Sequence, residues 1–327
     1  MPEGDTVFRA AQLLDRELSG CRLTRTDLRV PQHATTDLSG GLVLMTLPRG
    51  KHILTRIEHD GLAWTLHTHL KMEGAWRVLD HGRRWPRPAH QARVVLETEA
   101  KVAVGFSLGV VELLPTDAEL RVVGHLGPDL LGPDWDEPEA LGRLLSQPDR
   151  EVGDALRDQT NLAGLGNMYV AELCFVSGVH PRRPVGELSG LPRMLRRGKQ
   201  MLELNKERAV QSTTGDLRER ERMWVYRRDR SPCRRCGTPI AVDMQGPAGR
   251  ERRSTGARAV SPRLPPDGRP HDRPHDRPWA HGRVSQAIPS ICTSFLLSVR
   301  ISSFPLRRLS RSSSSTTWSW VSSVFSE

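Results

Sequence analysis

Long apolar runs and cysteines are what this sequence of 327 residues has least of. No stretch reaches the roughly 18 uninterrupted apolar residues that a membrane-spanning helix needs, so the sequence predicts no membrane span. The first residues, MPEGDTVFRA, include acidic side chains and no apolar segment, which is unlike a signal peptide. The cysteines are too few and too scattered for a disulfide framework, so we expect a reducing, cytoplasmic location. They are Cys21, Cys174, Cys233, Cys236 and Cys292.

Positive charge is in excess, because 48 Lys and Arg residues face 38 Asp and Glu residues, for a formal net charge of +10. A balance of this kind favours a polyanionic partner. Nucleic acid is favoured over a membrane surface, because nothing in the sequence resembles a lipid anchor. The length allows two compact domains of roughly 100–200 residues each, with residues left over.

The first domain is predicted over residues 1–117, with a helix over residues 1–19 followed by short strands. Apolar residues there alternate with a period of two, and Gly, Pro or Asp separates most runs. So many strands after one helix predict an antiparallel β-sandwich within an α+β fold. The predicted strands are Leu42–Leu47, His52–Ile57, Leu62–Leu66, Ala75–Leu79, Arg93–Glu97, Lys101–Phe106 and Val110–Leu114.

Three further regions follow. Helical spacing predicts a helical domain over residues 118–222. Residues 223–255 are basic and contain a Cys-x-x-Cys motif. Residues 256–327, with a doubled His-Asp-Arg-Pro and a Ser-rich end, predict a tail without a packed core. The predicted helices are Glu139–Leu145, Val152–Leu156, Met168–Val176 and Leu191–Arg208.

Pro2 and Glu3 directly follow the initiator methionine. A small second residue normally permits removal of Met1, which would leave Pro2 as a free secondary amine. Such an amine attacks an aldehyde-level carbon to form an iminium, and the neighbouring carboxyl group supplies or accepts the required proton. The structural alternative is that Pro2 sets the backbone ahead of the first helix and Glu3 complements its dipole.

A cation and several histidines lie on the early strands. The segment Arg49–His52 is a turn leading into a strand, and it places Lys51 where it meets a phosphate or a leaving oxygen. The alternative for Lys51 is a solvated turn residue. His52, His67 and His69 are either a hydrogen-bonded sheet face or metal ligands. No carboxylate lies at companion spacing, so the metal interpretation is the weaker one.

A glycine-rich turn separates two predicted helices within residues 158–172. Gly164 and Gly166 allow a tight turn, and Asn167 is expected to cap the second helix. Amide N–H groups at such a turn and helix start form an anion site. In a basic protein this arrangement favours a hairpin that binds DNA phosphates, with a purely structural turn as the alternative.

Together these segments resemble the formamidopyrimidine-DNA glycosylase / endonuclease VIII family. The resemblance covers residues 2–255 and implies a β-sandwich, a helix–two-turn–helix domain and a zinc-finger hairpin. It implies a bifunctional, monomeric, nucleoid-associated enzyme without a nucleotide cofactor, which excises oxidised bases from damaged double-stranded DNA and then nicks the strand. The motifs that carry it are Pro2-Glu3-Gly4, Arg49-Gly50-Lys51, Asn161–Glu172 and Cys233-x-x-Cys236-Gly-Thr-Pro-Ile240.

The resemblance also implies roles for single residues. Pro2 is the Schiff-base nucleophile at the sugar C1′, and Glu3 is the proton donor and acceptor for ring opening. Lys51 contacts phosphate and assists proton transfer. Asn167 holds the DNA backbone next to the lesion, and Met72 is the apolar wedge that fills the gap left by the flipped base. An ordinary core methionine is the alternative for Met72.

The substrate branch follows from one loop. The purine-specific branch carries an Asp-Pro-Arg-Arg-Phe-Gly loop after the later strands. Residues 106–114 read Phe-Ser-Leu-Gly-Val-Val-Glu-Leu-Leu instead. This resembles the endonuclease VIII branch, so oxidised pyrimidines and abasic sites are the expected substrates.

The finger departs from the family pattern. Four cysteines complete the tetrahedral zinc site of the family, but this chain has only the pair Cys233 and Cys236. Arg253 matches the hairpin tip whose Arg contacts phosphate, and a second Cys pair should follow it. Since two thiolates cannot close a structural zinc site, we expect a half site, weaker DNA binding and reduced excision. Four further candidate ligands have unsuitable spacing and Pro-rich surroundings. They are His271, His275, His281 and Cys292.

The genetic code offers a reason for this departure. One permitted set of codons for residues 256–262, GGT GCC CGC GCT GTC AGC CCG, reads Cys-Pro-Arg-Cys-Gln-Pro from its third base. The missing half of the zinc site therefore fits the sequence in another frame, at the expected place. Our hypothesis is that a frameshift lies near Thr255 and that residues 256–327 are out-of-frame translation.

Three functions remain open. The leading hypothesis is a DNA glycosylase with abasic-site lyase activity. The second is a non-catalytic or lyase-only DNA-binding remnant, which keeps the hairpin around Asn167 and the basic stretch 193–199 but has lost the finger. The third, a tautomerase-like enzyme, also uses an N-terminal proline but leaves the basic helical domain unexplained.

Overall fold

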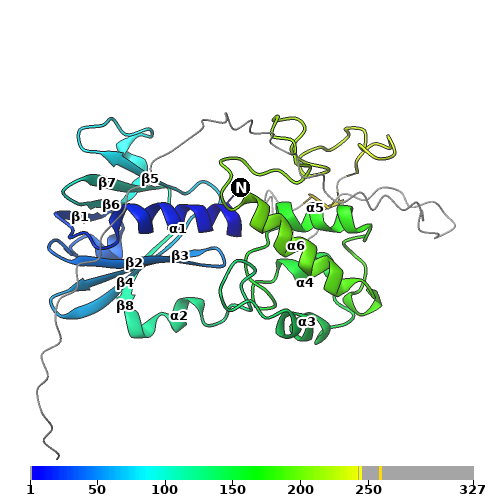
Figure 1. Cartoon of the computed structure of the whole chain (residues 1–327), viewed down its shortest axis with the longest axis horizontal. Helices are drawn as coiled ribbons and strands as arrows, with labels where there is room; N and C mark the ends of the chain where they lie inside the picture. Colours follow the sequence, from blue (N-terminus) through cyan, green and yellow to red (C-terminus); the bar gives the residue numbers. More distant parts are fainter. Residues whose placement is uncertain (1, 242, 245–257, 260–327) are drawn as a thin grey trace, which may run out of the picture. The chain divides into compact units, whose positions relative to one another are not determined.

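The computed structural model describes residues 2–241, 243–244 and 258–259, and the chain divides into two compact units, residues 1–269 and 270–327. Every element described below belongs to the first unit (Figure 1). Almost all of the predicted tail, residues 256–327, lies outside the described residues, and so does Arg253.

Helix α1 (Gly4–Leu18) opens the fold. Its buried residues Val7, Ala11, Leu14 and Leu18 recur every three or four positions, so one face of the helix enters the core. That face packs in one cluster with residues from both β-sheets, and Figure 1 shows α1 in dark blue among their strands. The helix predicted over residues 1–19 is confirmed.

Two four-stranded antiparallel sheets make up the N-terminal part of the protein. One has the order β2-β3-β4-β8 and the other β1-β6-β7-β5. The strands are β1 (Arg25–Leu28), β2 (Leu42–Arg49), β3 (His52–His59), β4 (Leu62–His69), β5 (Ala75–Asp80), β6 (Ala92–Glu97), β7 (Lys101–Phe106) and β8 (Val110–Pro115). The predicted α+β class and antiparallel sandwich are confirmed.

Helices dominate the chain after β8 (green in Figure 1). Helix α5 is buried along most of its length, from Met168 to Phe175, because its neighbours cover it on several sides. It ends at Gly178, whose φ of +66° is the left-handed conformation usual after a helix. The helices are α2 (Leu120–Val123), α3 (Glu137–Leu145), α4 (Val152–Arg157), α5 (Asn167–Ser177) and α6 (Leu191–Asn205).

Short elements complete the fold. The two-residue strands β9 (Asp243–Met244) and β10 (Arg258–Ala259) pair antiparallel. Single 3₁₀ turns are η1 (Pro31–His33), η2 (Ala89–Gln91), η3 (Thr116–Ala118) and η4 (Val185–Glu187).

Among the elements of four or more residues, the sequence interpretation missed two. Strand β1, Arg-Thr-Asp-Leu, has charged side chains and buries only Leu28, so it carries little alternation. Helix α2 is too short, at four residues, for a helical period to show.

Candidate active site

A pocket of about 230 Å³ lies at the start of the chain. Its volume is below the roughly 300–1,000 Å³ typical of sites for drug-sized ligands, so it suits a single sugar or base. The Pro2 pocket, as we name it, gathers six predicted site residues from four separate segments and adds three others. Its lining residues are Pro2, Glu3, Lys51, His69, Lys71, Met72, Arg157, Gly166 and Asn167.

The Glu3 carboxylate is buried against the first residues of α5. Its Oε2 accepts the N–H of Gly166 at 2.8 Å and of Tyr169 at 3.3 Å, and its Oε1 accepts the N–H of Met168 at 2.8 Å. Amides at a helix start lack partners within the helix and favour an anion. Glu3 makes no side-chain cap hydrogen bond to its own helix, α1. Its partner is therefore α5 rather than the helix that follows it in the sequence.

Glu3 and Lys51 have proton affinities shifted toward one another. Burial raises the pKa of Glu3 above its usual value, while the Lys51 charge and the α5 amides oppose that rise. Burial also lowers the pKa of Lys51, against the charge of Glu3. A buried acid and a partly buried base whose pKa values are shifted toward one another are suited to proton transfer during a reaction.

The turn that carries Lys51 is fixed by the helical part of the protein. Gly50 has a φ of +57°, and its N–H donates to Asp129 Oδ2 at 2.6 Å. Arg49 donates to the carbonyl of Gly127 at 3.1 Å. Lys51 is thus held at the pocket and is partly buried, so the solvated-turn alternative is wrong.

Gly164 allows the tight turn that the sequence predicts before α5. Its φ is +115°, a conformation that favours glycine, and its N–H donates to Gln159 Oε1 at 3.1 Å. Gly166 occupies the N-cap position and Asn167 is the first helical residue, so the predicted cap by Asn167 is wrong. Asn167 nevertheless lines the Pro2 pocket.

Gly166 is required for space rather than for conformation. Its backbone is extended, with a φ of −131°. A Cβ atom on Gly166 would lie 2.7 Å from Glu3 Cδ and 3.0 Å from Lys51 Nζ. The anion held by the Gly166 N–H is the protein's own Glu3 carboxylate, so this amide and that of Gly164 already have partners other than the predicted DNA phosphate.

The pocket holds two more basic side chains than the sequence interpretation indicated, Lys71 and Arg157, and His69 also lines it. His69 Nδ1 accepts the N–H of Lys71 at 2.9 Å, which leaves the ring proton on Nε2. Burial lowers the pKa of His69 to about 4, so the ring is neutral near pH 7. Arg157 pairs with Asp154 beside it. The sequence signal that was missed is Lys71 directly before Met72, with His69 two positions before Lys71.

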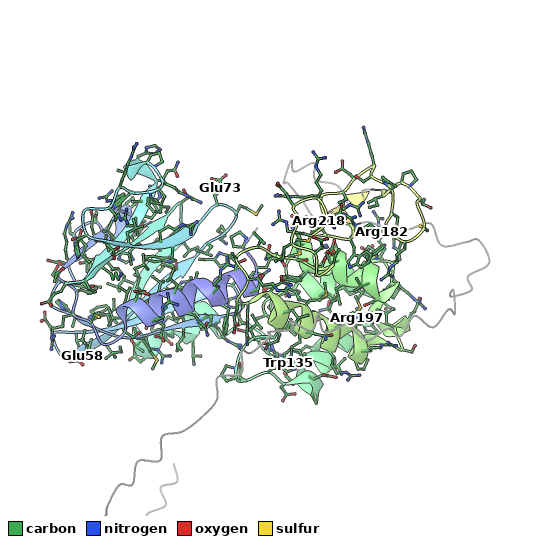
Figure 2. The ribbon with its side chains drawn as sticks, turned by 45° about the horizontal axis from the view of Figure 1, so that its top comes forward. Glu58, Glu73, Trp135, Arg182, Arg197 and Arg218 are labelled. Atoms are coloured by element: carbon green, nitrogen blue, oxygen red, sulfur yellow. The ribbon has the colours of Figure 1, made fainter. Side chains whose placement is uncertain are left out.

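Met72 lies in the loop between β4 and β5 and is 50% exposed, so the core alternative is wrong. Figure 2 labels the next residue, Glu73, at the tip of this loop. Arg87 Nη1 donates to the Glu73 carbonyl at 2.9 Å and holds the loop from the β5–β6 connection. The wedge role of Met72 stays a prediction.

The histidines form a hydrogen-bonded chain across the sheet. His52 Nδ1 lies 2.7 Å from His67 Nε2, and His67 Nδ1 lies 2.9 Å from Glu112 Oε2. Glu112 comes from β8, so a carboxylate that lies at no companion spacing in the sequence still reaches the histidines in the fold. Burial lowers the pKa of His52 to about 3. No cluster suited to a metal ion is found among the described residues.

The cysteine pair lies in a turn that packs against α5. The Cys233 N–H donates to the Thr238 carbonyl at 2.9 Å, and Cys233 is buried with Phe175 of α5. Cys236 is exposed. Since the described part of the chain brings no third ligand to these thiols, they do not by themselves fit the four-coordinate zinc of the family. Zinc stays a prediction from the resemblance.

Two models of one protein family match the two parts of this fold. The model of the formamidopyrimidine-DNA glycosylase N-terminal domain matches residues 1–107, and that of the family's H2TH domain matches residues 126–207. The chain belongs to the formamidopyrimidine-DNA glycosylase family.

Similar curated relatives carry endonuclease 8 or abasic-site lyase names. A probable endonuclease 8 2 of Streptomyces coelicolor is 53% identical over 255 residues, 77% of this chain and 91% of the relative. The DNA-(apurinic or apyrimidinic site) lyase Nei2 of Mycolicibacterium smegmatis is 49% identical, over 75% of this chain and 94% of the relative. Endonuclease 8 of Escherichia coli is 31% identical, over 73% and 93%.

Solved structures share the fold. The LlFpg protein, in a complex with a THF-DNA and an inhibitor, has a TM-score of 0.64 at 21% identity, over 80% of this chain and 98% of that one. MutM in complex with DNA containing carbocyclic 8-oxo-G has a TM-score of 0.63 at 22% identity, over 80% and 97%. In the described residues no helix is long and apolar enough to cross a membrane.

Proposed function

We propose that the protein is a bifunctional DNA glycosylase and abasic-site lyase of base excision repair that uses Pro2 as its nucleophile. One observation carries the proposal: Pro2 lines the same pocket as Glu3, a buried acid, and Lys51, a partly buried base, whose pKa values are shifted toward one another. Family membership and the lyase and endonuclease 8 names of the relatives support it.

The proposed first step replaces the base by the proline. The Pro2 nitrogen attacks C1′ with its lone pair, and the bond from C1′ to the base breaks, with its electron pair leaving on the base. The proton lost by the nitrogen passes to the departing base. Glu3 then protonates O4′ as the C1′–O4′ bond breaks, and the nitrogen lone pair completes the iminium.

The proposed second step cuts the strand. The iminium withdraws electrons and acidifies C2′, which loses a proton to the Glu3 carboxylate. The electron pair left on C2′ forms the C2′–C3′ double bond as the 3′ phosphate leaves with the C3′–O pair. Water then hydrolyses the iminium, which releases an unsaturated aldehyde and restores the Pro2 amine.

The pocket favours a DNA sugar as its occupant. Lys51, Lys71 and Arg157 offer positive charge to phosphates, and an extruded nucleotide needs a pocket of limited size. The short β7–β8 connection supports oxidised pyrimidines and abasic sites as the substrates. The proposal includes that the protein is a monomer, lies in the cytoplasm and is associated with the nucleoid.

Borohydride trapping tests the proposal. The full chain, with Met1 removed as shown by mass spectrometry, is incubated with a duplex that carries one abasic site. Reduction of the iminium is expected to give a stable adduct on Pro2, and the unreduced reaction is expected to nick the strand. A protein that starts at Pro2 yet forms no adduct would contradict the nucleophile assignment.

The half zinc site favours a second candidate, a lyase-only or non-catalytic DNA-binding remnant. Salt-dependent DNA binding without base excision would identify it. Adduct formation at an abasic site without excision of any base would identify the lyase-only form.

A further inference from the structure

Asp5 is a buried carboxylate beside the Pro2 pocket that the proposed reaction does not use. It lies in the first turn of α1, is 1% exposed and does not line the pocket. A carboxylate that is taken out of water must be stabilised by its surroundings. The contacts of Asp5 therefore indicate what this residue does in the fold.

Asp5 connects α1 to two other segments. Its Oδ2 accepts the hydroxyl of Tyr169 at 2.9 Å. The Nε2 of Gln211, which follows α6, donates to Oδ1 at 2.8 Å and to Oδ2 at 3.0 Å. Burial raises the pKa of Tyr169, so its phenol keeps the proton that it donates. Both of these donors are uncharged.

Tyr169 connects Asp5 to Glu3. Its hydroxyl donates to Asp5, while its backbone N–H donates to Glu3 Oε2 at 3.3 Å. We propose that Asp5 is a positioning residue for Glu3: by binding the Tyr169 hydroxyl it holds the start of α5 where its amides bind the Glu3 carboxylate. The proposal deepens the proposed function and rests on it, because it takes Glu3 as the proton donor.

Asp5 also acts on Glu3 through its charge. Burial is the main cause of the raised pKa of Glu3, and the negative charge of Asp5 adds to it while Lys51 opposes it. Loss of that charge lowers the pKa of Glu3, so Glu3 loses its proton at a lower pH. The groups that face Glu3 and Asp5 from the surrounding elements are Arg9 of α1, Lys51 of the β2–β3 turn, Tyr169 of α5, and Gln211 and Tyr226 after α6.

The two activities depend differently on this proton. During excision the sugar ring is closed, and O4′ must be protonated as its bond to C1′ breaks. A preformed abasic sugar is a hemiacetal in exchange with its open aldehyde, which Pro2 attacks without that protonation. Asp5 therefore matters more for excision than for cleavage at an abasic site.

The test compares Asp5→Asn, Tyr169→Phe and a control, Asp117→Asn, in the full chain. Asp5→Asn removes the charge at nearly constant size, and Asp117→Asn removes the same charge at an exposed position. Single-turnover excision of an oxidised pyrimidine is measured between about pH 6 and pH 9, and cleavage of the matching abasic duplex beside it.

For Asp5→Asn, we expect the alkaline limb of the pH–rate profile of excision to move to lower pH by about half a unit or more. The ratio of excision to abasic cleavage at pH 8 should fall about fivefold. Tyr169→Phe should lower that ratio about threefold without the move to lower pH, since the charge of Asp5 remains. Asp117→Asn should match the wild type.

Wild-type ratios and wild-type pH profiles in both Asp5→Asn and Tyr169→Phe would overturn the proposal. If thermal unfolding shows that Asp5→Asn is not folded, Tyr169→Phe decides, and an unchanged ratio there overturns it. Failure of the proposed function looks different, because the wild-type protein itself would then form no borohydride adduct.

Discussion

The Pro2 pocket and the turn around Cys233 both rest on α5, at opposite halves of that helix. The N-cap Gly166 and the first turn of α5 hold Glu3 by three N–H donors. Phe175, in its second half, packs against Cys233, and the Arg235 guanidinium lies 4.8 Å from the Phe175 ring centre. One helix thus supports the proposed chemistry at one end and a finger segment at the other.

The two regions differ in completeness. The three N–H donors to Glu3 are present in the described residues, although each lies more than 160 residues away in sequence. The Cys233 turn has its backbone hydrogen bonds and its apolar contact but only two thiols. We therefore expect the pocket chemistry to be separable from the finger, and the predictions below test that separation.

The largest expected effect comes from filling the space beside Glu3. In Gly166→Ala the new methyl group would lie 2.7 Å from Glu3 Cδ, so the carboxylate must move. Since the φ of −131° suits alanine, the loss reports on space alone. Excision and abasic cleavage should both fall by about a hundredfold in single-turnover assays.

Gly142→Ala is the matched control for this substitution. Gly142 lies within α3, and nothing lies within 4 Å of its added Cβ. Activity should equal that of the wild type, and stability should rise by about 0.5–1 kcal/mol because alanine favours the helix. Equal activity losses in the two alanine variants would contradict the close packing at Glu3.

Restoring the second cysteine pair should have the next largest effect. In a gene rewritten so that Cys-Pro-Arg-Cys-Gln follows Thr255, the product should bind about one zinc per chain. Excision should rise by about tenfold or more, because the hairpin then holds Arg253 to the DNA, while abasic cleavage should change by less than about threefold.

Equal changes in the two assays would show that the pocket and the finger are not separable. The frame itself is decided by sequencing the coding DNA. Codons at positions 256–261 that cannot yield Cys-Pro-Arg-Cys in the shifted frame would end the frameshift hypothesis.

The sequence alone predicts those features of the protein that depend on neighbouring residues. Strands such as Lys101–Phe106 were predicted because alternation is a local property. Pro2, Glu3 and Lys51 were singled out because their chemistry is local too, and the family resemblance joined them. The structure then placed all three in one pocket.

Contacts between distant segments were beyond reach. Nothing near Glu3 in the sequence shows that its carboxylate binds the start of α5. The sequence therefore predicted Asn167 as the cap of that helix, whereas the Glu3 carboxylate accepts its first amides. The need for glycine at position 166 likewise depends on two side chains from other elements. Such features follow from tertiary packing rather than from any local pattern.

Replacing Met72 should have a smaller effect, confined to duplex DNA. If Met72 fills the gap left by an extruded base, Met72→Ala should slow excision from a duplex by about tenfold, but not from a single strand. The side chain is 50% exposed, so thermal stability should not change. Met45→Ala, at a methionine of β2 that is 39% exposed, is the control and should keep wild-type rates. A loss on both kinds of DNA would point away from a wedge.

The smallest expected effect is on the stability of the sheet beside the pocket. Burial lowers the pKa of His52 to about 3 and that of His69 to about 4, both below the value of 6.5 expected when unfolded. The unfolded chain therefore binds protons first as the pH falls, so the stabilisation present above pH 6.5 is lost progressively below it. Urea unfolding should show a loss of about 1–2 kcal/mol between pH 7 and pH 5, allowing for partial exposure to solvent. His52→Gln keeps a donor for His67, and in this variant the loss of unfolding free energy between pH 7 and pH 5 should be about half as large. An undiminished loss would show that groups other than these histidines cause it.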